Sequence, residues 1–577
     1  MSETERFSGL SGALTNYGDR DFARYLRLAN ARSMGFSTTM LSKPVVGIAS
    51  TFSEFNNCHR GVPDLVAAVK RGVLAAGGLP LEFPTISLGE PYLNPTALFF
   101  RNLMAMDTEE MIRGQPMDAV VLVGGCDKTV PAQLMGALSA GLPAIQVVTG
   151  PQSTNRWRGE RIGACTDCRR FWARYRAGEM SPADIAEAEG NLVATAGTCA
   201  VMGTASTMAS LAEALGIILP GTAAIPAVHA DRLRAAEASG RAVMNLLRRG
   251  IRIGDIITEK SVENALRVLL AIGGSTNAII HLTAIAGRAG IKVSLDRLNA
   301  LSDTTPVLVD LKPTGDFYME DLHAAGGIGA VLRELKPLLH LDCLTVAGDT
   351  LGERLSGEPG FVDRTVVRSL DAPLQPQGGL VALFGSLAPR GAILKRAAAD
   401  PALFETEGRA VVFASLEDLS ERIDDPDLDV VPDDFLVLQN AGPLSASGMP
   451  EAGYLPIPQK LARAGVKDMV RISDARMSGT AYGTIVLHVT PDAASGGPLA
   501  YVKTGDRIRI SVKARRIDLL VDEAELARRR ETMPLATVEP ERGYARLFRR
   551  EVLLADEGCD FDSLRAQPMR PAEISGD

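Results

Sequence analysis

The sequence predicts an α/β protein with a doubly wound parallel sheet in its N-terminal domain and a β-rich C-terminal domain. In the first two-thirds of the 577 residues, continuous apolar runs alternate with amphipathic helical patterns. This alternation is typical of a parallel sheet covered by helices on both faces. After a segment rich in proline and glycine, residues 371–379, the pattern changes to short strands. We therefore expect domains at residues 1–372 and 380–577.

The N-terminal elements are expected in the order strand, helix, strand, helix, strand, at residues 43–50, 63–76, 118–123, 131–140 and 144–148. The first helix carries Pro63 in its first turn and stops at Gly77, and the second stops at Gly141. Proline at the start and glycine after the end are the usual helix boundaries.

In the C-terminal domain, short strands are expected at residues 380–384, 410–413, 435–438, 484–489 and 506–512. In the last of these, Ile508, Ile510 and Val512 alternate with polar residues, which indicates a half-buried strand. A charged helix at residues 523–530 and a polar tail are expected to close the chain.

The composition excludes some classes of function. A net charge of −8 argues against a general nucleic-acid-binding protein, which needs a basic surface to neutralise phosphates. No apolar stretch follows the N-terminus, and the most apolar window, residues 214–228, is interrupted by glycine and proline. We therefore expect a cytoplasmic protein that does not bind a membrane, in which the seven cysteines are metal ligands or free thiols.

Three cysteines lie where ligands usually collect in an open α/β sheet. Cys58 and Cys126 follow predicted strands, and Cys199 lies just before a predicted helix. Three separated cysteines can hold an iron–sulfur cluster and leave one iron without a protein thiolate. Each one alone could equally be a small core residue.

The other four cysteines give weaker signals. Cys165 and Cys168 form a single CxxC, which is weak evidence for zinc without a second pair. Cys343 and Cys559 are expected in the core or at the surface. None of these four receives a functional role from the sequence.

Four longer motifs carry a resemblance to a known family. They are GGCDKT at residues 124–129, CAVMGTAST at 199–207, GGSTNA at 273–278 and SDARMSGT at 473–480. Together they resemble the dihydroxy-acid dehydratase / phosphogluconate dehydratase family, from about residue 40 to residue 530. SDARMSGT followed by AYGT is similar to the sugar-acid branch. The resemblance implies an α/β domain and a β-barrel-like domain with the active site between them.

The resemblance also implies the cofactors. Cys58, Cys126 and Cys199 would hold a [2Fe–2S] cluster, or a [4Fe–4S] cluster as in related enzymes. The implied Mg²⁺ ligands are Glu90, Asp127, Lys128 and Glu451. An ammonium group repels Mg²⁺, so the resemblance implies a carbamylated Lys128 that supplies an oxygen ligand and takes part in catalysis.

Catalysis is expected to begin with removal of the C2 proton of a 2,3-dihydroxy acid. The resemblance implies Ser478 as the base, although a serine hydroxyl must first be ionised. His488 is a less favoured alternative base, and Thr480 is expected either to bind substrate or to shape a turn. By resemblance, the chain is expected to form a homodimer or homotetramer.

The expected activity is that of a hydro-lyase that converts a sugar acid, such as a pentonate, to a 2-keto-3-deoxy acid. Three alternatives stay open. The first is a dihydroxy-acid dehydratase of branched-chain amino-acid synthesis. The second is a zinc hydrolase, against which stands the absence of a spaced histidine pair in the sequence. The third is a non-catalytic iron–sulfur sensor, which would have no need of the Mg²⁺-type ligands.

Overall fold

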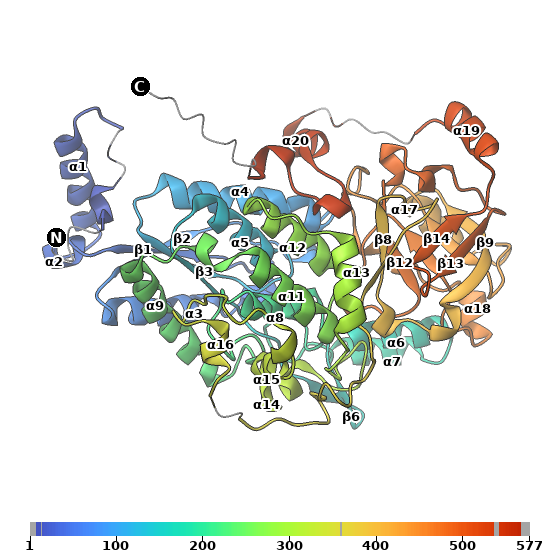
Figure 1. The fold of residues 1–577 in the computed structure, drawn as a ribbon, viewed down its shortest axis with the longest axis horizontal. Helices are drawn as coiled ribbons and strands as arrows, with labels where there is room; N and C mark the ends of the chain where they lie inside the picture. The colour runs from blue at the N-terminus through green and yellow to red at the C-terminus, as the bar shows by residue number, and fades with distance from the viewer. Residues whose placement is uncertain are drawn as a thin grey trace.

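The structure is a computed structural model that describes residues 7–12, 14, 16–357, 360–535, 540 and 542–566. It confirms the predicted fold class: an N-terminal α/β domain with a parallel sheet, and a C-terminal barrel-like sheet with helices around it (Figure 1).

The N-terminal sheet consists of parallel strands in the order β2-β1-β3-β4. In its register, Ile48 lies between Glu82 and Val121. Burial of both faces explains why β1 and β3 are continuous apolar runs. The strands are β1 (Val45–Ser50), β2 (Leu79–Pro84), β3 (Ala119–Val123) and β4 (Ala144–Val147).

Helices cover both faces of this sheet. In Figure 1, α3 (Val62–Ala75) and α9 (Ala230–Arg249) lie on one face, and α4 (Ala97–Gly114) and α5 (Thr129–Ala140) lie on the other. The chain moves outward from β1 to β2 in one direction and from β3 to β4 in the other. The topological switch point, where such sheets bind ligands, therefore lies between β1 and β3.

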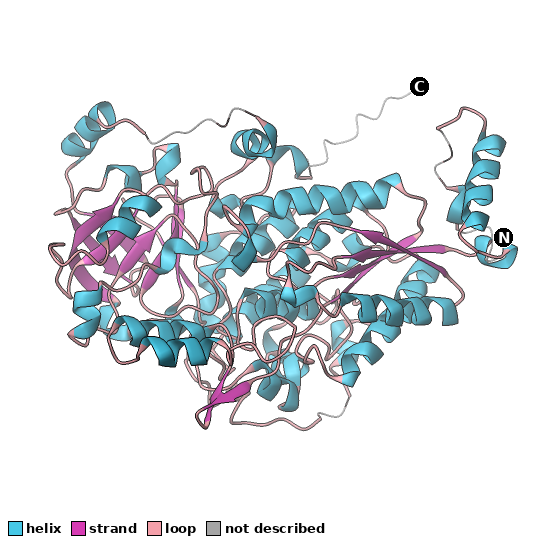
Figure 2. Cartoon of the chain, turned by 180° about the vertical axis from the view of Figure 1, so that it is seen from behind, coloured by secondary structure: helices cyan, strands magenta, loops and turns pink. Residues whose placement is uncertain are grey.

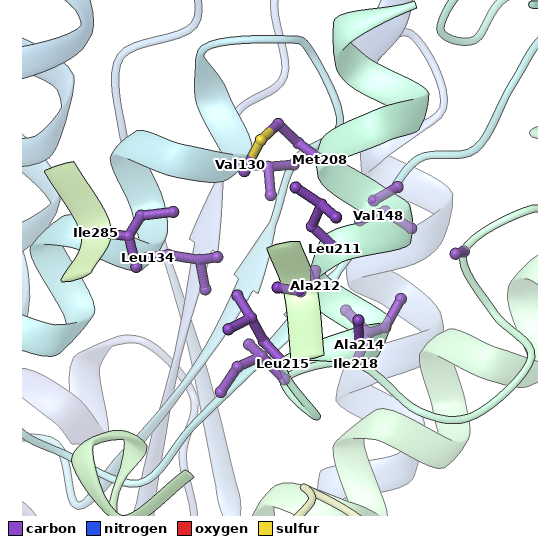
Figure 3. Close-up of a cluster of buried hydrophobic side chains, with 14 of the residues drawn as sticks. Val130, Leu134, Val148, Met208, Leu211, Ala212, Ala214, Leu215, Ile218 and Ile285 are labelled. Atoms are coloured by element: carbon purple, nitrogen blue, oxygen red, sulfur yellow. The ribbon is translucent and has the colours of Figure 1, made fainter. Parts of the chain in front are cut away.

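A large apolar core joins the sheet to the central helices. Figure 3 shows Val130 and Leu134 of α5 facing Met208 and Leu211 of α8 (Thr204–Ala214), with Ile285 of α12 (Asn277–Arg288) beside Leu134. Further α-helices of this part of the chain are α1 (Arg20–Ser33), α2 (Thr38–Leu41), α10 (Ile253–Ile256), α11 (Glu259–Ala271), α13 (Leu295–Thr304), α14 (Met319–Ala324), α15 (Gly327–Glu334) and α16 (Leu351–Arg354).

The C-terminal sheet is almost closed. Its strands follow the order β14-β13-β9-β10-β11-β12-β8-β7, and a bridge between Phe384 and Arg516 links the two ends. Figure 2 shows this group of strands at the end of the molecule away from the N-terminus. The strands are β7 (Val381–Leu383), β8 (Gly391–Leu394), β9 (Glu405–Phe413), β10 (Phe435–Leu438), β11 (Arg471–Ser473), β12 (Ile485–Thr490), β13 (Arg507–Ser511) and β14 (Arg516–Leu519). Helices α17 (Leu416–Arg422), α18 (Gln459–Arg463) and α19 (Glu523–Thr532) surround it.

Two segments connect the domains. A hairpin of β5 (Asn155–Trp157) and β6 (Glu160–Ile162) precedes α6 (Thr166–Arg176) and α7 (Pro182–Glu189), and Arg176 of α6 pairs with Asp424 at 2.6 Å. Helix α20 (Gly543–Glu551) returns to α4, where the rings of Phe548 and Phe99 are 4.5 Å apart. The domains are thus tied together on more than one side.

No helix in the described part of the chain combines the length and the apolar character needed to cross a bilayer.

Candidate active site

The loops after β1 and β3 bring two predicted cluster ligands together at the switch point. Cys58 lies in the loop after β1, and Cys126 lies in the loop after β3. The pKa of Cys58 is raised well above its usual value, mainly by a hydrogen bond between the two thiols and also by burial. Neighbouring parallel strands end at the same edge of the sheet, so the fold itself creates this thiol pair.

A buried histidine holds the two loops in place. His59 Nε2 accepts hydrogen bonds from the backbone N–H groups of Gly125 and Cys126, both at 3.1 Å. Burial lowers the pKa of His59 to about 4, so the ring is neutral at pH 7 and its Nε2 can accept. The Nδ1 atom then carries the ring proton and donates a hydrogen bond to Ser87 Oγ, 2.7 Å away. His59 positions Cys126 beside Cys58.

The third predicted cluster ligand lies on an adjacent loop. The N–H of Gly197 donates to the carbonyl of Asn57 at 3.2 Å, which attaches the Cys199 loop to the Cys58 loop. Among the described residues, the sulfur atoms of Cys58, Cys126 and Cys199 are not all within 4.8 Å of one another. They are therefore not gathered tightly around one point, as ligands of a single zinc ion would be.

Three carboxylates converge beside the thiols. Oxygen atoms of Glu90, Asp127 and Glu451 all lie within 4.8 Å of one another. Glu90 follows β2 and Asp127 follows β3, whereas Glu451 comes from the C-terminal domain. The predicted set of acidic Mg²⁺ ligands is thus brought together by both domains. Hard oxygen donors in such a group suit Mg²⁺.

Two buried cations balance these carboxylates. Arg476 donates from Nη1 to Glu451 Oε1 at 2.6 Å and from Nη2 to Glu90 Oε2 at 2.9 Å. The ammonium group of Lys128 pairs with Asp127. The side chains of both cations are fully buried. The predicted ligand Lys128 therefore lies within the carboxylate group.

The electrostatic environment separates the two glutamates. Burial opposes ionisation of Glu90, but the charges of Arg476 and Lys128 and a hydrogen bond from Thr96 outweigh it and lower the pKa of Glu90 to about 2. Burial raises the pKa of Glu451, and the charge of Glu90 adds to that rise. Glu90 is therefore the more readily ionised carboxyl group of the pair.

The predicted base and substrate-binding residue lie in one turn. Ser478 Oγ and Thr480 Oγ1 are 2.9 Å apart, and Lys395 Nζ donates to the carbonyl of the intervening Gly479 at 3.1 Å. A Cβ atom on Gly479 would lie 2.7 Å from Ser275 Cβ, so only glycine lets this turn pack so closely against the N-terminal domain. Burial lowers the pKa of Lys395 to about 7.

The turn also approaches the Cys199 loop. Thr480 lies against Gly203, where an added Cβ would lie 3.0 Å from Thr480 Cγ2 and 3.7 Å from Cys199 Cβ. The segment 476–480 thus extends from the carboxylates to the cysteine loop. The catalytic roles of Ser478 and Thr480 stay predictions.

The alternative base, His488, is buried on β12. Burial, and then the charge of Arg476, lower the pKa of His488 to about 3. Among the residues that the structure describes, its Nε2 atom has no hydrogen-bond partner. His488 is thus a neutral imidazole near Arg476, and its lowered pKa makes it a weak base for the C2 proton.

Sequence reasoning missed Arg476, His59 and Lys395. Arg476 lies inside the SDARMSGT motif, and His59 directly follows the predicted cluster ligand Cys58. An arginine or lysine in a single sequence looks like a solvated surface residue. Complete burial of a cation is the signal that identifies Arg476 and Lys395, and this burial is visible only in the fold.

The fold and this site define a two-domain enzyme with a candidate active site at the junction of its α/β sheet and its barrel. Comparison with protein families agrees with this class. The family described as Dihydroxy-acid/6-phosphogluconate dehydratase N-terminal matches residues 43–354 of this chain. The family described as Dihydroxy-acid/6-phosphogluconate dehydratase C-terminal matches residues 365–559. The chain belongs to this dehydratase family and is a hydro-lyase.

Similar proteins include several named sugar-acid dehydratases. The 6-deoxy-6-sulfo-D-gluconate dehydratase of Pseudomonas putida is 47% identical over 91% of this chain and 91% of its own length. The L-arabonate dehydratase of Azospirillum brasilense is 48% identical over 90% of this chain and 91% of its own. A dihydroxy-acid dehydratase of Clostridium botulinum is 37% identical over 92% of this chain and 96% of its own length. The sensor and the zinc hydrolase are therefore set aside.

Proposed function

We propose that this hydro-lyase dehydrates a sugar acid, such as a pentonate, to a 2-keto-3-deoxy acid. The observation that carries the proposal is the convergence of Glu90, Asp127 and Glu451 from both domains. Such a group can hold the cation that binds a substrate carboxylate. The choice of a sugar acid rests on the names of relatives at 47% and 48% identity, against 36% to 41% for relatives that are named dihydroxy-acid dehydratases.

The residues present fit both implied cofactors. Glu90, Asp127 and Glu451 offer hard oxygen atoms for Mg²⁺, and Cys58, Cys126 and Cys199 offer thiolates for an iron–sulfur cluster of the [2Fe–2S] or [4Fe–4S] type. When bound, Mg²⁺ and the cluster would act as Lewis acids toward the substrate carboxylate and the departing hydroxyl group.

Ser478 is the proposed base for the C2 proton. Its hydroxyl is half-buried and contacts that of Thr480, which can donate a hydrogen bond to a developing serine alkoxide. Lys395 holds the turn by donating to the Gly479 carbonyl, and in its protonated form its charge favours loss of the Ser478 proton. After the C2 proton and the C3 hydroxyl have left, the enol takes a proton at C3 and becomes the keto acid.

Lys128 is proposed to react with carbon dioxide to give a carbamate. Its Nζ already lies against Asp127 within the carboxylate group, so the new oxygen atoms would join the same donor set. We also propose that the chain works in the cytoplasm as a homodimer or homotetramer, as the family resemblance implies.

The test is product formation in D₂O by Ser478→Ala and by Ser511→Ala. Ser511 lies on β13 and bonds Glu405, so it is a serine of the same domain outside the site. Wild type and Ser511→Ala are expected to give a 2-keto acid with one deuterium at C3. Ser478→Ala is expected to lose about 10²- to 10⁴-fold in turnover, the range for removal of a general base. Full turnover by Ser478→Ala would assign the base to another residue, and a product without deuterium at C3 would contradict protonation of the enol by a solvent-derived proton.

A further inference from the structure

Two thiols outside the described chemistry, those of Cys165 and Cys168, form a chain that ends at the proposed cluster ligand Cys199. Cys165 is the residue before the first turn of α6, and Cys168 lies three residues later. Residues three apart on a helix lie on the same face, which explains the contact between these two thiols. Cys165 also meets Cys199, with the two sulfur atoms 2.9 Å apart. Cys165 therefore contacts a thiol on each side.

This arrangement differs from that of the two remaining core cysteines. Cys343 Sγ accepts a hydrogen bond from the side-chain amide of Asn264, and Cys559 contacts the sulfur of Met449. Both are buried, whereas Cys165, Cys168 and Cys199 are each partly exposed. A small oxidant can therefore reach the three connected thiols more easily than Cys343 or Cys559.

We propose that Cys165, Cys168 and Cys199 form a thiol–disulfide exchange site. In it, Cys165 forms a reversible disulfide with Cys199, and Cys168 then breaks this disulfide by attacking Cys165. Disulfide sulfur atoms are about 2.05 Å apart, so the Cys165–Cys199 contact needs only about 1 Å of movement to close. The oxidant is a disulfide of the glutathione class. Both thiols lose a proton and together two electrons, and each oxidised glutathione becomes two reduced glutathione molecules.

The second step is an exchange without a further oxidant. Cys168 attacks the Cys165 sulfur, the Cys165–Cys199 bond breaks, and a Cys165–Cys168 disulfide forms. Cys199 leaves with the electron pair and takes a proton, so it is again a free thiol. One thiol of the CxxC thus protects Cys199 from lasting oxidation, and the other regenerates it.

The consequence for the cluster rests on the proposed function, because it requires Cys199 to be an iron ligand. A Cys199 that is held in a disulfide cannot bind iron. The exchange site would keep Cys199 available for reloading of a chain that has lost its cluster in oxidising conditions.

The first experiment maps disulfides and does not depend on activity. Full-length protein is freed of iron with a chelator, treated with oxidised glutathione, denatured, alkylated and digested, and each cysteine is assigned by mass spectrometry. We expect Cys165 joined to Cys168 or Cys199, with Cys343 and Cys559 still alkylated as thiols. If Cys165 and Cys199 both stay free, or carry only glutathione, the exchange site is disproved.

Single variants separate the two steps. Cys168→Ser blocks release, so the fraction of chains with a Cys165–Cys199 disulfide should rise severalfold over wild type. Cys165→Ser should leave Cys199 open to a lasting glutathione adduct. The matched control, Cys343→Ser, should give the wild-type pattern. Equal disulfide patterns in wild type and Cys168→Ser would overturn the role of Cys168.

The second experiment adds iron and sulfide to the glutathione-treated chains and follows visible absorption. Wild type should recover its absorption without a reductant, and Cys168→Ser only after dithiothreitol. Equal recovery of the two would contradict the protective role. A Cys165→Ser chain that holds less iron even before oxidation would make Cys165 a cluster ligand and overturn the proposal. If no chain gains absorption even with dithiothreitol, the proposed cluster fails while the disulfide map stands on its own.

Discussion

Arg476 Nη2 lies 2.9 Å from Glu90 Oε2 and donates a hydrogen bond to it across the junction of the two domains. The same guanidinium group holds Glu451 through Nη1 at 2.6 Å. Arg476 is fully buried, so its charge is stabilised mainly by these carboxylates. Because it joins residues from both domains, Arg476 sets the spacing of the candidate Mg²⁺ ligands.

Replacement of Arg476 by methionine should destabilise the protein strongly. Removal of one partner from a buried ion pair typically costs about 3–5 kcal/mol, since the other charge stays buried without compensation. The measurement is the urea midpoint of unfolding. The control, Arg509→Met, removes an arginine whose pair with Glu407 is exposed, and it should cost less than about 1 kcal/mol. Similar midpoints for both variants would show that Arg476 is not the main cation of this site.

Replacement of Cys126 by serine should remove the visible absorption of the iron-loaded protein. Serine keeps the size of the side chain but is a poorer ligand for iron than a thiolate. Absorption and bound iron are measured after anaerobic purification. Cys343→Ser, a buried cysteine outside the switch point, should keep both. A Cys126→Ser protein that keeps its colour would refute the ligand assignment.

Replacement of Lys128 by arginine should abolish the proposed carbamate while a buried cation stays beside Asp127. With ¹³C-labelled bicarbonate, wild type should show a carbamate carbon resonance that Lys128→Arg lacks. Replacement of a residue that only hydrogen-bonds to a metal ligand typically lowers activity by about 10- to 100-fold. Loss of a metal ligand itself should lower activity by more than this. Full activity in Lys128→Arg would rule out a carbamate ligand.

Lys395 should make stability depend on pH. Burial lowers its pKa to about 7 in the folded chain, against about 10.4 for an unperturbed lysine. Between these values the unfolded chain binds more protons, so stability should rise with pH by up to about 1.4 kcal/mol per pH unit. Lys395→Met should remove this contribution, and the exposed Lys467→Met should keep it. Thermal unfolding from pH 7 to 10 measures both, and equal pH slopes for the two variants would contradict the assignment.

Much of the fold could be predicted because many of its strands and helices are marked by local patterns of apolar and polar residues. The apolar runs that became β1, β3 and β4 are strands in the structure, and the helix predicted at residues 523–530 is α19. Strand β2 was missed because its sequence, LPLEFP, contains two prolines and lacks alternation. Helix α20 was missed in what was expected to be a polar tail, since only its packing on Phe99 makes it a stable element.

The site could be predicted only in part. The switch-point loops explain why Cys58 and Cys126 meet, since strand order alone brings them together. The contact between Cys165 and Cys199 depends on how α6 packs, which no local pattern encodes. Arg476 lay within a recognised motif, but an arginine in a loop gives no sign in one sequence that it will be fully buried between two carboxylates.

The most direct test of the account is the ratio of kcat/KM for a panel of pentonates and hexonates to that for dihydroxyisovalerate. The protein is purified without oxygen, supplied with iron, sulfide and Mg²⁺, and assayed for 2-keto acid. The account predicts that at least one sugar acid is preferred by a factor of about 100 or more, a difference of about 2.7 kcal/mol in transition-state binding. Preferred turnover of dihydroxyisovalerate would contradict it and place the enzyme among the dihydroxy-acid dehydratases.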